Sequence, residues 1–146
     1  MAIKKSETSA EKKKIEAAKY SGKQSLHNLY DECNAHLRAL DFYKLELKYL
    51  QKRLGDIVKE NTNQDILAQA EQFQNLFIIT QDNLDEMHHL IKARLGAVER
   101  IIKKKPSHTD EKTIEEGSKY SQSVHNTEKS FASLKLRFNK FLGKYL

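Results

Sequence analysis

Apolar residues recur at alternating steps of three and four along most of this chain. Steps of this kind keep one stripe of an α-helix facing a partner, as in coiled coils. The pattern predicts a first long helix over about residues 23–60. Its apolar seam consists of Leu26, Leu29 or Tyr30, Cys33, Leu37, Leu40, Tyr43, Leu47, Leu50, Leu54, and Ile57 or Val58.

Two further segments have the same spacing and predict helices over about residues 64–104 and 108–144. The polar stretch 61–63 interrupts the pattern, and Thr62 or Asn63 can cap the second helix. Pro106, the only proline, ends that helix. The two seams include Ile66, Phe73, Phe77, Thr80, Leu84, Met87 and Ile91, and then Tyr120, Val124, Phe131, Phe138 and Tyr145.

Each predicted helix holds roughly 35–40 residues and would be roughly 55 Å long. Short connections between long helices make neighbouring helices antiparallel. The sequence therefore predicts an all-α fold, an up-down-up bundle of three long antiparallel helices over residues 23–146. A second arrangement stays open, in which two long helices dimerise into a four-helix core and the third packs alongside.

Residues 1–22 differ from the rest, because they have few apolar anchors and many lysines. We expect them to form a basic N-terminal arm that is flexible or partly helical. Residues 1–24 contain seven Lys and three Glu, whereas the remaining chain contains 19 Lys or Arg and 17 Asp or Glu. Residues 1–24, which include the arm, therefore carry most of the net charge of +6.

Composition narrows the class of protein. With 146 residues, 38% of them apolar, the chain can bury a core without disulfides, and the lone Cys33 cannot form an internal one. The longest apolar run, residues 76–79, is too short to span a bilayer. Residues 1–24 are Lys-rich and mostly polar, and lack the apolar segment of a signal peptide. We therefore expect a cytoplasmic protein.

Five large apolar residues fall off the main seams at one level of the predicted bundle. A helix in a three-helix bundle touches two neighbours, so a wide core stripe is one interpretation. The other is an interaction face for a homodimer, a protein partner or the N-terminal arm. The residues of this predicted face are Phe42, Leu45, Tyr49, Ile78 and Ile79.

Histidines also align at one level of the predicted bundle, each with a carboxylate about one turn away. Helix bundles that hold di-iron centres draw Glu and Glu-x-x-His ligands from facing helices. A metal-binding bundle is therefore an alternative hypothesis, although only His36 falls on a core-facing position. The predicted ligands are His36, His88, His89, His125, Glu32, Glu86 and Glu128.

Other chemistry has less support in the sequence. The five glycines are scattered, so no phosphate-binding loop is present, and no pattern places a nucleophile beside a base. The basic arm and the basic amphipathic segment 131–146 suggest a weaker alternative, binding to nucleic acid or an anionic membrane surface. We expect a non-catalytic bundle that binds a protein partner or a copy of itself, with no cofactor and no small-molecule substrate.

Overall fold

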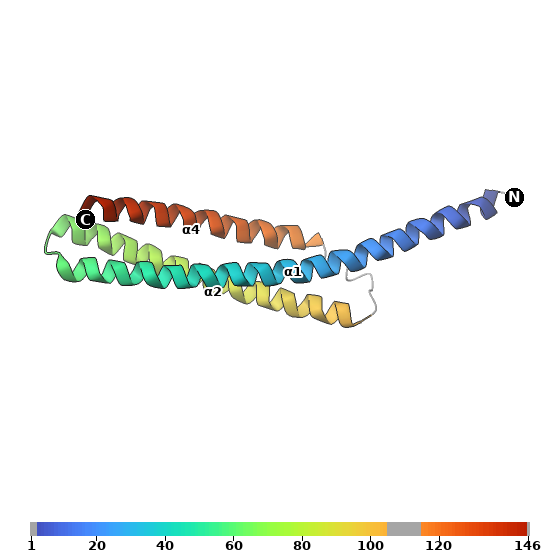
Figure 1. Ribbon diagram of the computed structural model, residues 1–146, viewed down its shortest axis with the longest axis horizontal. Helices are drawn as coiled ribbons and strands as arrows, with labels where there is room; N and C mark the ends of the chain where they lie inside the picture. The colour runs from blue at the N-terminus through green and yellow to red at the C-terminus, as the bar shows by residue number, and fades with distance from the viewer. Residues whose placement is uncertain (1–2, 105–114, 146) are drawn as a thin grey trace.

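The computed structural model describes the backbone of residues 3–104 and 115–145, and the side chains of residues 26–104 and 115–144. These ranges form three long helices and no strand: α1 (Ile3–Glu60), α2 (Gln64–Lys103) and α4 (Gly117–Tyr145). α2 runs antiparallel to α1, and α4 runs parallel to α1 (Figure 1). The expected all-α bundle, running up, down and up, is confirmed.

Side chains of the connecting residues define the turn between α1 and α2. The Nδ2 of Asn61 donates to the carbonyl of Ile57 at 2.8 Å, which satisfies an acceptor at the end of α1. The side-chain oxygen of Asn63 accepts from the backbone N–H groups of Asp65 and Ile66, at 2.9 and 3.4 Å. Asn63 is thus the N-cap of α2, as its amide side chain suits.

The first helix begins much earlier than the sequence pattern predicts. α1 starts at Ile3 instead of near residue 23, so the expected arm continues the helix and extends beyond the bundle (Figure 1). Residues 3–21 are rich in Ala, Glu and Lys and contain neither Gly nor Pro, so nothing in them breaks a helix. Gly22 is tolerated within the helix, at a cost of about 1 kcal/mol.

The third helix is described from Gly117, where the carbonyl of Glu116 accepts from the backbone N–H groups of Lys119 and Tyr120, both at 3.2 Å. Residues 105–114 lie outside the described part of the chain. The predicted start near residue 108 falls among them.

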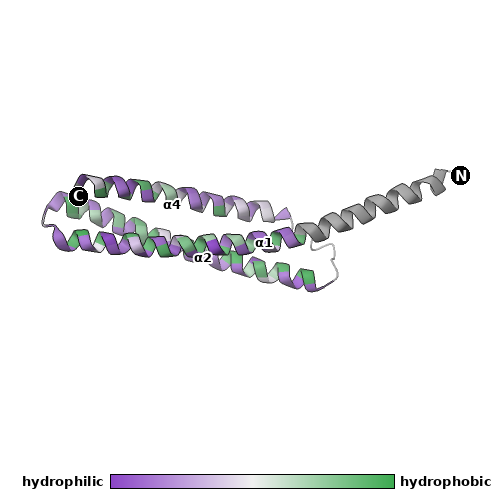
Figure 2. Cartoon of the chain, viewed as in Figure 1, coloured by the Kyte–Doolittle hydropathy of each residue, from purple (hydrophilic) through white to green (hydrophobic). Residues whose placement is uncertain are grey.

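The core consists of the predicted seams, whose hydrophobic residues alternate with hydrophilic ones along each helix (Figure 2). Four phenylalanines join α2 to α4 near one end of the bundle. The ring centroids of Phe77 and Phe138 are 5.1 Å apart, and those of Phe73 and Phe141 are 5.2 Å apart. Aromatic pairs at such distances add about 0.5–1.5 kcal/mol each to the energy of burial.

Candidate functional site

The largest exposed apolar side chains of α1 share one strip of its surface. Phe42, Leu45 and Tyr49 have 56%, 67% and 58% of their surface exposed. Steps of three and four place them above one another on the helix. The seam residues Leu40 and Leu47, by contrast, are fully buried. We call Phe42, Leu45 and Tyr49 the α1 strip.

Polar neighbours extend the α1 strip towards α4. Leu45 and Tyr49 line a groove of about 390 Å³ between α1 and α4, whose lining also includes Lys135 and Asn139. The Nη1 of Arg53 donates to the Tyr49 hydroxyl at 3.2 Å, and its guanidinium carbon lies 6.0 Å from the centre of the Tyr49 ring. Tyrosine and arginine are residue types enriched at protein interfaces.

The two isoleucines of the predicted face lie on α2. Ile78 and Ile79 are 52% and 56% exposed. Consecutive residues of an α-helix point about 100° apart, so the two isoleucines leave the surface of α2 in different directions. Polar contacts occupy the edge between α1 and α2 at this level: Lys44 Nζ lies 2.9 Å from Asp85 Oδ1.

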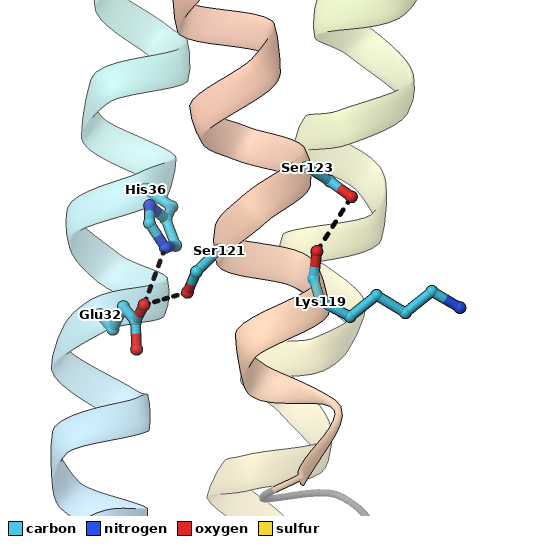
Figure 3. Close-up of polar contacts among 5 residues, drawn as sticks. All are labelled: Glu32, His36, Lys119, Ser121 and Ser123. Atoms are coloured by element: carbon cyan, nitrogen blue, oxygen red, sulfur yellow. Dashed lines mark hydrogen bonds and ion pairs between the residues drawn. The ribbon is translucent and has the colours of Figure 1, made fainter.

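The carboxylate of Glu32 joins α1 to α4. Its Oε1 accepts a hydrogen bond from the hydroxyl of Ser121 and lies 3.4 Å from the Nε2 of His36 (Figure 3). This Nε2 is buried and makes no hydrogen bond within the described residues. The neighbouring Ser123 instead donates to the backbone carbonyl of Lys119 at 3.0 Å (Figure 3).

The other predicted metal ligands have separate surroundings. The Nε2 of His88 lies 3.1 Å from Asp41 Oδ1, and Glu128 accepts a hydrogen bond from Tyr43. Three more are exposed on the surface: Glu86, His89 and His125. Within residues 26–104 and 115–144, no three His, Cys, Asp or Glu side chains lie close enough together to hold a metal ion.

A buried arginine lies beside Glu32 where the three helices meet. Arg94 of α2 is 7% exposed, and its guanidinium carbon lies 4.7 Å from the centre of the Tyr120 ring. It also hydrogen-bonds with the thiol of Cys33. Burial raises the pKa of this thiol, and the positive charge of Arg94 lowers it by a smaller amount.

Gly117 allows α4 to begin close against the other two helices. A Cβ at this position would lie 2.8 Å from Cδ2 of Leu29 and 3.0 Å from Nη2 of Arg94. The space enclosed beside these residues is about 10 Å³, room for one water molecule at most. This polar cluster therefore packs the helices together and has no room for a ligand.

Arg94 is not among the residues that the sequence pattern singles out, because the predicted seam follows apolar residues. The spacing of the seam could nevertheless have identified it. Thr80 and Met87 belong to that seam, and Arg94 lies a further seven residues along the chain. An arginine at a seam position, with Tyr120 and Cys33 available as partners, is the pattern of a buried cation.

Comparisons of the chain with protein-family models, with curated proteins and with solved structures give no match. Among the helices of residues 3–104 and 115–145, none contains an apolar stretch long enough to cross a membrane. The lysines of the arm lie outside the residues whose side chains are described.

Proposed function

We propose that this chain is a non-catalytic helical bundle that acts by binding protein, and that the α1 strip pairs with the α1 strip of a second copy. The observation that carries the proposal is the exposure of three large apolar side chains at helical spacing, each more than half exposed. Contiguous exposed apolar surface of this kind is typical of interaction sites.

The order of residues along α1 suits an antiparallel, two-fold pairing centred on Leu45. Phe42 and Tyr49 lie three and four positions from Leu45, so Phe42 of one copy meets Tyr49 of the other. Asp31 and Lys59 lie equally far from Leu45 on its two sides, so opposite charges meet at both ends of the pairing.

The pairing is expected to be weak and reversible. The strip consists of three side chains on one helix, whereas a stable interface buries about 800 Å² on each partner. Arg38 and Lys52 also fall opposite each other, and their like charges oppose association. Both features favour a dimer that forms at about micromolar concentrations or above.

Sedimentation velocity over a range of concentrations tests the proposal. The native chain should shift towards a dimer as its concentration rises, whereas Phe42→Asp and Tyr49→Asp should stay monomeric. Leu136→Asp is a matched control, since Leu136 is an equally exposed apolar residue, 58% exposed, on α4. This control should dimerise like the native chain, and circular dichroism should show all variants folded.

A native chain that stays monomeric at about millimolar concentration overturns the pairing of two copies. Dimerisation that survives Phe42→Asp and Tyr49→Asp together overturns the role of the α1 strip. The alternative occupant is a different protein. A monomeric chain that binds such a protein, and loses it on Phe42→Asp but not on Leu136→Asp, assigns the strip to that partner instead.

A further inference from the structure

A groove runs along the side of the bundle where α2 and α4 meet. Its first part, of about 410 Å³, includes Leu76 and Thr80 of α2 and Leu134 of α4. Its second part, of about 310 Å³, shares Thr80 and Ser130 with the first and continues to Leu90. From Leu76 to Leu90 it follows α2 for roughly 21 Å, at 1.5 Å per residue. We call it the α2–α4 groove.

The floor of the α2–α4 groove is apolar. Phe131 and Leu134 line it and are buried, and Leu76 and Met87 line it and are half-buried. The hydroxyl of Thr80, also on the floor, donates to the backbone carbonyl of Leu76 at 2.7 Å and needs no partner from outside the chain. A ligand that covers this floor must therefore offer an apolar stripe.

The rim of the groove is basic at its Leu76 end, whereas the exposed Glu86 lines the part that continues to Leu90. Lys129 and Arg137 line the Leu76 end, are exposed, and have no ion-pair partner in the part of the chain that the structure describes. Eight positions separate them on α4, roughly 12 Å. α4 as a whole contains six Lys or Arg and one acidic residue, Glu128.

We propose that the α2–α4 groove binds an amphipathic helix of another protein, one whose apolar stripe is flanked by Asp or Glu. The length of the groove fits about four turns of helix, whose apolar residues at i, i+3, i+4 and i+7 cover the floor. Carboxylates beside the stripe meet Lys129 and Arg137. The bound helix packs as a fourth helix beside α2 and α4.

The charge of the rim selects against the chain's own N-terminal arm as the occupant. Residues 1–24 contain seven Lys and three Glu, so the arm brings positive charge to a basic rim. The α1 strip lies on a different helix from both walls of the groove. Binding of the acidic helix therefore does not depend on self-association of the chain.

Fluorescence anisotropy with two synthetic peptides tests the proposal. The first is an amphipathic peptide of about 18 residues with Leu along one stripe and Glu beside it, and the second has Lys in place of every Glu. The native full-length chain should bind the acidic peptide at least about tenfold more tightly than the basic peptide.

Variants locate the binding site. Lys129→Glu combined with Arg137→Glu should weaken binding of the acidic peptide by at least about tenfold. The matched control combines Lys119→Glu with Lys140→Glu, which makes the same change of charge on α4 outside the groove. This control should weaken binding by less than about threefold. Leu90→Asp, at the edge of the floor, should also weaken it.

Equal affinity for the two peptides overturns the proposal, and so does an equal loss of affinity in the groove pair and its control. Vesicles of phosphatidylcholine containing phosphatidylserine supply the competing outcome. If the native chain binds these vesicles through Lys129 and Arg137 but does not bind the acidic peptide, the groove is a membrane contact and the proposal is wrong. Sedimentation of each variant separates this result from any change in self-association.

Discussion

The Nζ of Lys135 in α4 lies 3.0 Å from Oε2 of Glu46 in α1, and 89 positions of the chain separate the two residues. The hydrogen bond from Ser121 to Glu32 spans the same 89 positions. The two contacts are fourteen residues apart on each helix, which is two repeats of the seven-residue pattern. α1 and α4 therefore keep one parallel register along this edge of the bundle.

Reversing the Lys135 charge tests this register. Lys135→Glu should lower the free energy of unfolding by about 0.5–1 kcal/mol, because two carboxylates then face each other at a partly exposed site. Adding Glu46→Lys should restore most of the loss. Urea denaturation at low and high salt measures both effects, and a double variant no more stable than Lys135→Glu alone would contradict the pairing.

Phe138 should be among the most costly residues to truncate. It is fully buried and its ring packs against Phe73, Phe77 and Phe141. Phe138→Ala should lower the free energy of unfolding by about 3–5 kcal/mol, because it removes apolar burial and leaves a cavity. Leu136→Ala on the exposed side of α4 should change it by less than about 0.5 kcal/mol in the same urea titration.

Replacing two glycines by alanine should change the stability of the chain in opposite directions. No atom lies within 4 Å of a Cβ built on Gly55 in α1, so Gly55→Ala should stabilise the chain by about 0.5–1 kcal/mol through helix propensity. Gly117→Ala should destabilise it by about 1–2 kcal/mol, since its Cβ would displace the buried Leu29 and Arg94. Thermal unfolding measures both effects. If the melting temperatures of both variants rise, the close approach of the helices at Gly117 is refuted.

Alkaline pH should weaken the bundle. Burial raises the pKa of Cys33 from its ordinary 9.0, and burial followed by the charge of Glu128 raises the pKa of Tyr43 from 10.0. Both groups hold their protons more tightly in the folded chain than in the unfolded one. Their contribution to stability is therefore complete below about pH 9 and is lost as pH rises through the raised pKa values.

Thermal unfolding followed between pH 7 and pH 11 measures this loss. A variant with Cys33→Ala and Tyr43→Phe should lose less of its melting temperature over that range than the native chain does. An equal loss in both proteins would assign the alkaline sensitivity to other groups.

Periodicity in the sequence was sufficient to predict the fold class and the buried seams. It identifies which residues face inward, and the break at residues 61–63 is local, since Asn61 and Asn63 make their capping contacts within a few residues. α1 begins nearer the N-terminus than the seam indicates, for a different reason. A seam requires apolar anchors, whereas the backbone of residues 3–22 continues as helix without one.

The candidate sites depend on two quantities: the height of each residue along the bundle, and the direction in which its side chain points around the helix axis. The sequence pattern predicts the direction less well than the height. His36 and His88 each meet a carboxylate of α1, whereas His89 and His125 point to the surface. The α2–α4 groove depends on how far two helices stand apart, which no local spacing encodes. The exposure of the α1 strip can be predicted more directly from the sequence, because Phe42, Leu45 and Tyr49 lie off the apolar seam.

The constant register between α1 and α4 restricts how the length of this chain can change. A one-residue insertion in α1 between Glu32 and Glu46 turns the side chains after it by about 100° relative to those before it, so that Ser121 and Lys135 no longer both meet their partners. A deletion inside the bundle that preserves the packing must remove seven residues from α1, α2 and α4 at the same level. The part of α1 that extends beyond the bundle is not restricted in this way. Among descendants of a common ancestor, the packed parts of the three helices should therefore shorten or lengthen together, seven residues at a time.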